Sequence, residues 1–235
     1  SFLYTLPSVV DDIDYDITHI VRGADHVTNS AVQVQLFDAI GGKAPQMAHF
    51  ALMTGKGGEG LSKRHGAMSI GEYRDEAGLE AMSIVSLIAR VGTSEPIEAF
   101  ASVERLIDGF DFGKFSRSTA KLDPAGLEVI NAKILHMLPY DAVKDRLSGV
   151  DQSFWTAVQP NLNKMADVNV WKDIVNGPVT PIIEDAEHIA KVRALLPEGV
   201  ITSETWSQWT NSIKNELGVK GKALFMPLRQ ALTGQ

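Results

Sequence analysis

A short run of cationic side chains follows a glycine-rich stretch in this 235-residue chain. Glycines stand at positions 55, 57, 58 and 60, and Ser62, Lys63 and Arg64 come soon after them. Glycine lets a backbone approach a ligand closely, and lysine and arginine donate charge-assisted hydrogen bonds to phosphate oxygens. The pattern indicates an anion-binding loop, although composition alone fits a solvated surface loop equally well. The sequence G-x-x-x-x-G-K-[ST] is absent, so the loop is not a P-loop.

Composition narrows the classes of protein to consider. The formal net charge of -7 argues against a general nucleic-acid binder, yet residues 201–235 carry four basic against two acidic side chains. The absence of cysteine excludes disulfides, thiolate metal sites and a cysteine nucleophile. The six histidines form no H-x-x-x-H or E-x-x-H cluster, so we expect no protein-bound metal. No run approaches the roughly 20 apolar residues that span a bilayer, and no signal peptide is evident, which favours a cytoplasmic protein without a membrane partner.

The first 55 residues predict part of an α/β domain. Residues 16–23 alternate apolar and polar types with β-branched side chains, which predicts a buried strand. Residues 28–40 predict a helix capped by Thr28 or Asn29, with an apolar stripe that comprises Val32, Leu36, Phe37 and Ile40. A second apolar run at 46–53 completes a strand, helix, strand unit of a parallel sheet. Asp11 and Asp12 are interpreted as the start of a helix, where carboxylates suit the positive end of the dipole.

The rest of the chain is predicted to be helical. Ser69 and Glu72 have capping-box spacing before a helix that ends at Gly78, and an apolar, central helix follows over 79–92. Asp123 and Pro124 fit the N-cap and first position of the next helix. Further helices are expected at 140–148, 152–165, 181–196, 203–217 and 222–232, with a domain boundary in 147–153. The fold class is therefore mostly α with an N-terminal α/β portion.

The cationic segment resembles a known catalytic loop. "LSKRHGA", residues 61–67, is similar to the Lys-Met-Ser-Lys-Ser loop of class I aminoacyl-tRNA synthetases, in the Leu-Ser-Lys-Arg form of glutamyl-tRNA synthetases. Leu61 takes the methionine position, Ser62 and Lys63 match, and Arg64 takes the last serine position. Gly60 replaces the first lysine of the motif, which removes one cation.

Other landmarks of the same family occur in order. Residues 3–41 resemble the late part of the catalytic domain, with a Tyr, then Val-Val-Asp-Asp, Ile-Thr-His and Arg-Gly-x-Asp-His before a helix. Residues 110–135 resemble the segment that joins the loop to the anticodon domain, and 220–234 resemble the end of the first anticodon-binding subdomain. The His-x-Gly-His motif of class I synthetases is absent, so we interpret the chain as an internal fragment, inactive alone.

The resemblance implies roles for individual residues. Lys63 would stabilise the ATP phosphates as charge develops, within an ATP-binding loop formed by Leu61, Ser62, Lys63 and Arg64. Tyr4, Arg22 and His26 would lie in the glutamate pocket, with Arg22 near the substrate carboxylate. Read without the family, Tyr4 is also compatible with a packed core aromatic, Arg22 with a surface charge, and His26 with a structural histidine held by Asp25. Basic residues near the end of the chain would face tRNA: Lys220, Lys222 and Arg229.

The resemblance also implies a division of the chain and a reaction. Residues 1–55 would be a remnant of the Rossmann-like catalytic domain, 56–150 the catalytic loop and a helical stem-contact region, and 151–235 part of a helical-bundle anticodon-binding domain. The function would be ATP-dependent ligation of L-glutamate to tRNA-Glu, or also tRNA-Gln, through a glutamyl-adenylate, by a monomer that takes Mg²⁺ with its ATP. A non-catalytic tRNA-binding module and a paralogue that glutamylates a tRNA nucleoside are the alternatives.

Overall fold

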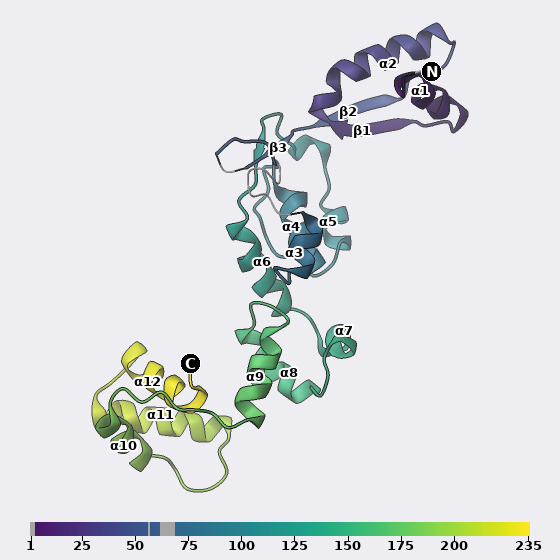
Figure 1. Ribbon diagram of the computed structural model, residues 1–235. Helices are drawn as coiled ribbons and strands as arrows, with labels where there is room; N and C mark the ends of the chain where they lie inside the picture. Colours follow the sequence, from purple (N-terminus) through teal and green to yellow (C-terminus); the bar gives the residue numbers. More distant parts are fainter. Residues whose placement is uncertain (1–2, 56, 62–68) are drawn as a thin grey trace. The chain divides into compact units, whose positions relative to one another are not determined.

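The computed structural model describes residues 3–55, 57–61 and 69–235. It divides into two compact units, the first extending to Ala166 and the second from Asp167 to Gln235 (Figure 1). The boundary between the units lies beyond the stretch 147–153 in which the sequence placed a domain boundary. The functional division at residues 55 and 150 stays a prediction.

The chain begins with a small parallel α/β arrangement. Helix α1 spans Thr5–Asp14, strand β1 His19–Gly23, helix α2 Val27–Ala39 and strand β2 Gln46–Phe50, with a 3-10 turn, η1, at Ala24–His26. Strands β1 and β2 pair in parallel, so that Arg22 lies opposite His49. Figure 1 shows the two strands side by side, with α1 and α2 next to them. The predicted strand, helix, strand unit is confirmed.

Several local expectations in this part are wrong. Asp11 and Asp12 lie in the second half of α1 rather than at its start, because the helix already begins at Thr5. Neither Thr28 nor Asn29 caps α2: the turn η1 leads directly into the helix, and His26 occupies the cap position without a side-chain bond. Strand β1 is only partly buried, since Val21 is 52% exposed.

The inner face of α2 is polar where the sequence suggested an apolar stripe. Its buried residues are Ser30, Gln33 and Phe37, whereas Val32 is 47% exposed. Positions 30, 33 and 37 follow the helical spacing of three and four residues, so they share one face. Buried polar groups need hydrogen-bond partners, which makes this face a candidate for function.

The remainder of the first unit is mainly helical. The capping box of Ser69 and Glu72 is confirmed at the start of α3, Ile70–Asp75. Helix α4 spans Ala81–Arg90 and α5 Glu104–Asp108, and the two-residue strands β3, Met53–Thr54, and β4, Ala120–Lys121, pair in parallel. Helix α6 spans Ala125–Leu135, and the carboxylate of Asp123 accepts from the backbone N–H of Ala125. Its regular turns thus begin one residue later than the sequence indicated.

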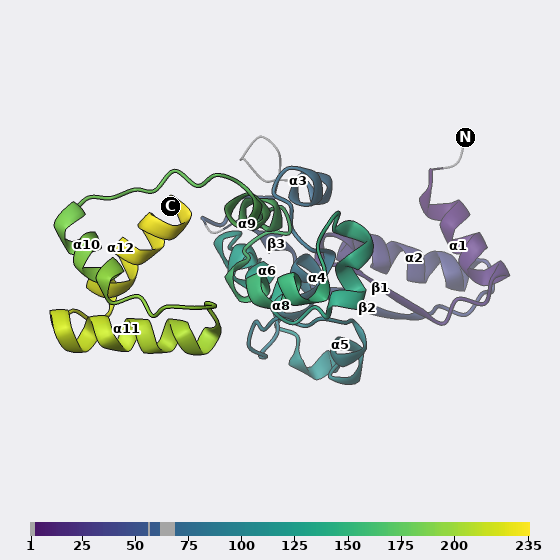
Figure 2. The same cartoon turned by 90° about the horizontal axis from the view of Figure 1, so that it is seen from below.

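Helices α4 and α6 lie side by side and form the core of this unit (Figure 2). The central apolar cluster consists of Leu79, Leu87, Leu127, Ile130 and Ile134. Outside that cluster, Val85 and Ile88 of α4 are 38% and 42% exposed. Helix α4 is therefore central, as expected, but its apolar surface is buried on one side only.

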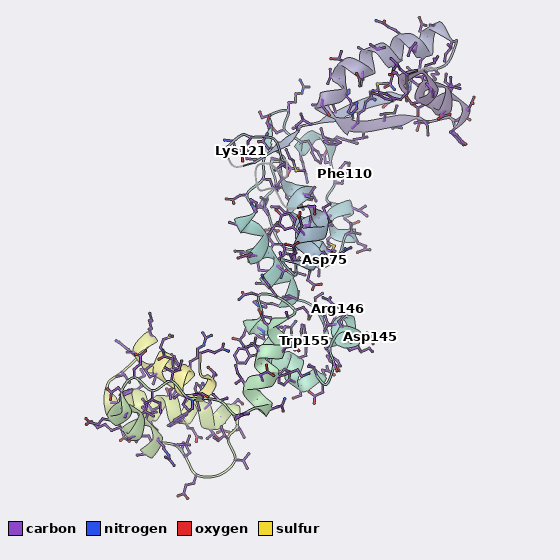
Figure 3. All side chains as sticks on the ribbon, in the orientation of Figure 1. Asp75, Phe110, Lys121, Asp145, Arg146 and Trp155 are labelled. Carbon is purple, nitrogen blue, oxygen red and sulfur yellow. The ribbon has the colours of Figure 1, made fainter. Side chains whose placement is uncertain are left out.

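A buried asparagine connects these helices to the segment that follows. Asn131 is fully buried, and its Oδ1 accepts from the Glu80 N–H and the Ser83 hydroxyl, each at 2.8 Å. Its Nδ2 donates to the carbonyl of Asn163. The indole of Trp155, labelled in Figure 3, donates to the carbonyl of Leu138. These bonds explain why the first compact unit continues past residue 150.

The elements that surround these bonds are short. Helix α7 covers Tyr140–Val143 and η4 Lys144–Arg146, and helix α8 covers Gln152–Val158 and η5 Gln159–Asn161. They replace the two continuous helices expected at 140–148 and 152–165. Asp151 caps α8 by accepting from the Phe154 N–H, and Pro160 lies within η5, where the regular helix has already ended.

The second unit consists of four helices. They are α9, Asp167–Asn176; α10, Ala186–Ala194; α11, Ser203–Leu217; and α12, Lys222–Thr233. Helices α10 to α12 enclose a cluster of Val192, Trp209, Ile213, Leu224 and Leu228. The expected helices at 203–217 and 222–232 are confirmed, whereas α9 lies outside the helical stretches that the sequence suggested. Within the described residues, no helix has the length and apolar character needed to cross a bilayer.

The hydrogen bonds of Asn131 generate a stability prediction. Replacing Asn131 by Ala leaves the buried hydroxyl of Ser83, the part-buried N–H of Glu80 and the carbonyl of Asn163 without this partner. The free energy of unfolding should fall by roughly 1–3 kcal/mol for each group that stays unpaired and buried. Urea unfolding of the variant measures this. The control is Asn161→Ala, because Asn161 is exposed on η5. Equal stability of the two variants would contradict the role of Asn131.

Candidate active site

The first turns of α2 bring together two of the residues singled out in the sequence. Asn29 donates from Nδ2 to the hydroxyl of Tyr4 at 2.8 Å, and the same Nδ2 lies 3.3 Å from Nδ1 of His26. An amide nitrogen carries two hydrogens, so Asn29 can satisfy both groups at once. Nε2 of His26 lies 3.8 Å from the Asp25 carboxylate. Tyr4, 64% exposed, is not a packed core aromatic.

Arg22 lies on β1 and turns its side chain toward the polar face of α2. Its Nε and Nη2 donate to the Ser30 hydroxyl at 3.1 and 2.6 Å, and Nη2 also donates to Gln33 Oε1 at 2.6 Å. Sδ of Met47 lies 3.8 Å from the same nitrogen. Arg22 is partly buried, so it is not a solvated surface charge.

The electrostatic setting of Arg22 differs from that of Arg74 and Arg146. Arg146 pairs with Glu80, and the hydrogen bonds that it donates raise the pKa of its guanidinium. Arg74 pairs with Asp75 in the same way, and Asp75 and Arg146 are labelled in Figure 3. In the part of the chain that the structure describes, Arg22 contacts no carboxylate and its Nη1 makes no hydrogen bond. Its positive charge is therefore available to an anionic ligand.

The base of the predicted anion-binding loop is ordered by backbone contacts. Strand β3 pairs with β4, and Thr54 forms an antiparallel bridge with Gly60. Between them the N–H of Gly55 donates to the carbonyl of Glu59, and Gly58 has a φ of 90°, which favours glycine. Leu61 is 41% exposed. Ser62, Lys63 and Arg64 lie outside the described residues, so their roles stay predictions.

The three basic residues predicted to face tRNA belong to the second unit. Lys220, Lys222 and Arg229 are all exposed. Lys222 and Arg229 lie seven residues apart on α12, which places them two turns apart on the same face of the helix. This arrangement lets both side chains contact the phosphate backbone of a polyanion.

The sequence did not indicate four residues whose side-chain hydrogen bonds hold the candidate site together: Asn29, Ser30, Gln33 and His49. Asn29 was expected only as a possible helix cap. His49 on β2 has its Nε2 2.6 Å from the Ser30 hydroxyl. One signal was present in the sequence, since Ser30 and Gln33 are polar residues three apart within a helix expected to pack on a strand. No metal-binding cluster of His, Cys, Asp or Glu occurs in the described ranges.

Comparison with known proteins adds the family to this geometry. Residues 3–129 match the family described as "tRNA synthetases class I (E and Q), catalytic domain". The chain is 52% identical over 239 residues to glutamate--tRNA ligase 1 of Maricaulis maris and 49% identical over 241 residues to glutamate--tRNA ligase 2 of Hyphomonas neptunium. Each alignment covers 100% of this chain and 54% of the relative, so the chain spans about half the length of these curated relatives.

Solved structures support the same fold at low sequence identity. A glutamate tRNA ligase from Elizabethkingia meningosepticum, crystallised in complex with its amino acid, superposes with a TM-score of 0.73 at 20% identity. Glutamate-tRNA synthetase from Elizabethkingia anophelis gives a TM-score of 0.70 at 21% identity. Both alignments cover 99% of this chain and 54% of the solved chain. The fold and the family match together show that the chain belongs to the class I tRNA synthetases of the glutamate and glutamine type.

Proposed function

We propose that the complete polypeptide that carries these residues ligates L-glutamate to tRNA at the expense of ATP, through a glutamyl-adenylate. The observation that carries the proposal is Arg22, a partly buried guanidinium that contacts no carboxylate within the described residues and is held in place by Ser30 and Gln33. Such a group suits the carboxylate of an amino-acid substrate. The family match and the names of the relatives support glutamate as that amino acid.

Within this proposal, Tyr4 and His26 line the same pocket as Arg22. Asn29 contacts both of their side chains, which keeps them at the start of α2, one turn before Ser30. Tyr4 would contact the substrate beside Arg22, and His26 would lie at the rim. Residues 1–55 would then act as the amino-acid part of the catalytic domain.

The loop at 61–64 would supply the ATP contacts. Lys63 would place a cation where charge builds on the α-phosphate in the transition state, a role that needs positioning rather than acid or base chemistry. Leu61, Ser62 and Arg64 would complete the loop, and Mg²⁺ would enter with ATP. Strands β3 and β4 support this role because they fix the start of the loop.

The remaining parts would bind tRNA. Residues 56–150 would include a stem-contact region, and 151–235 part of an anticodon-binding domain, with Lys220, Lys222 and Arg229 against the phosphate backbone. The acceptor is tRNA-Glu, with tRNA-Gln as a second acceptor to be tested.

Glutamate-dependent exchange of pyrophosphate into ATP, followed by charging of each purified tRNA, tests the proposal. A tRNA-binding module without catalysis would bind tRNA but would catalyse no exchange of pyrophosphate into ATP.

Arg22→Ala should raise the KM for glutamate strongly. The substrate would lose a charge-assisted contact of roughly 1.5–3 kcal/mol, which corresponds to about tenfold or more. Tyr4→Phe removes one hydroxyl and should have a smaller effect. Steady-state exchange kinetics of the complete polypeptide measures both, and an unchanged KM in Arg22→Ala would exclude this residue from the pocket.

Lys63→Ala should lower kcat for adenylate formation far more than it raises the KM for ATP, because the lysine acts mainly on developing charge. By analogy with the loss of one oxyanion donor, the cost should be roughly 2.7–4 kcal/mol, on the order of a hundred- to a thousand-fold. Arg64→Ala should cost less. Turnover of Lys63→Ala at the unmodified rate would overturn the catalytic role of the loop.

Gly60→Lys restores the cation that the family motif has at this position. Among the described residues, a Cβ at Gly60 would meet no atom within 4 Å, so a side chain can start from this position. Adenylate formation by this variant should be unchanged or slightly faster. A strong loss of rate in the same exchange assay would mean that Gly60 is required for the backbone itself.

A further inference from the structure

The guanidinium of Arg22 is held by a shell of uncharged side chains. Ser30 and Gln33, which accept its hydrogen bonds, are 5% and 3% exposed. Nε2 of Gln33 donates to the Ser8 hydroxyl on α1 at 3.2 Å, and that hydroxyl donates to the carbonyl of Thr5 at 3.1 Å. Gln33 is therefore fixed at both ends of its amide.

Ser30 is itself held by several contacts. Its hydroxyl accepts from Nε and Nη2 of Arg22, donates to the carbonyl of His26 at 3.0 Å, and lies 2.6 Å from Nε2 of His49. No carboxylate is among these contacts. The groups around Arg22 thus hold the cation without compensating its charge.

An uncompensated cation discriminates between substrates. A carboxylate supplies both hydrogen-bond acceptors and a negative charge to a guanidinium, whereas an amide of the same shape supplies only an acceptor and brings N–H donors toward other donors. The difference grows when the site is partly desolvated. Any carboxylate within the protein shell would neutralise Arg22 and remove this preference.

We infer that Gln33 is a specificity-determining residue: with Ser30 and His49 it positions Arg22 while leaving its charge free, so that a free acid is selected over the corresponding amide. The inference rests on the proposed function, because it takes Arg22 as the residue that binds the substrate carboxylate. Gln33 itself is a positioning residue, since it acts on the substrate through Arg22.

Gln33→Glu tests the inference most sharply. Glutamate keeps the length of the side chain and an acceptor for Arg22. Its second oxygen can accept from Ser8 once the Ser8 hydroxyl turns away from the Thr5 carbonyl, so the packing is retained while one negative charge is added. The KM for glutamate should rise roughly tenfold to a hundredfold, and the ratio of kcat/KM for glutamate over glutamine should fall by a similar factor. The KM for ATP should not change.

Gln35→Glu is the matched control. It makes the same substitution two residues away on α2, where the side chain is exposed. Its kinetics should equal those of the unmodified polypeptide. Gln33→Met removes the acceptor without adding charge, so it should raise the KM for glutamate while keeping the preference over glutamine. If Gln33→Met lost the preference for glutamate over glutamine as completely as Gln33→Glu, the preference would not depend on the free charge of Arg22, and the inference would be overturned.

Arg22→Ala distinguishes a failure of the proposed glutamate pocket from a failure of the inference on Gln33. If this variant binds glutamate normally, the proposed pocket is wrong. If Arg22→Ala raises the KM but Gln33→Glu behaves like Gln35→Glu, the pocket stands and the inference on Gln33 is overturned. Should Gln33→Glu fail to fold, Ser30→Asp places a carboxylate against the same guanidinium, with the same expected loss of preference and the same contradicting outcome.

Discussion

The partly buried charge of Arg22 is the constraint on which the N-terminal part of this protein depends. A guanidinium in this position needs acceptors for its N–H groups, and α2 supplies them from Ser30 and Gln33. Those two residues occupy positions on the helix that would otherwise hold apolar core residues. The hydrogen bonds of Arg22 accordingly join β1 to α2, while Phe37 is buried on the same face of the helix. The geometry of a ligand site thus takes precedence over a purely apolar face.

The same polar face organises the neighbouring elements. Gln33 contacts Ser8 of α1, Ser30 contacts His49 of β2, and Asn29 contacts Tyr4 at the start of α1. Two segments well separated in sequence, α1 with its cap residue and strand β2, therefore meet along the first two turns of α2. Because none of these contacts brings a carboxylate to Arg22, the assembly fixes the direction of its side chain and leaves its charge for a ligand. An ion pair with a carboxylate of the protein would have fixed the Arg22 side chain equally well, but it would have neutralised the charge that a ligand needs.

Much of this architecture follows from local sequence patterns, and the exceptions have physical reasons. The parallel strand, helix, strand unit and the Ser69 capping box follow from periodicity and from cap chemistry. The cap of α2 could not be predicted, since Asn29 is a favourable cap residue that instead uses its amide on Tyr4 and His26. Ser30 and Gln33 were overlooked because hydrophobic periodicity treats polar residues as exposed, although both are buried here. Arg22 and Tyr4 came from a family resemblance, and no rule of spacing would have distinguished them from surface residues.

A structure of the complete polypeptide with L-glutamate bound tests the central claim most directly. The account predicts a substrate carboxylate oxygen within about 2.7–2.9 Å of Arg22 Nη1, the distance expected for a charged pair. It also predicts that the bonds from Arg22 to Ser30 and Gln33 persist in the bound state. A substrate carboxylate bound elsewhere, or an Arg22 side chain that leaves Ser30 and Gln33 when glutamate binds, would contradict it.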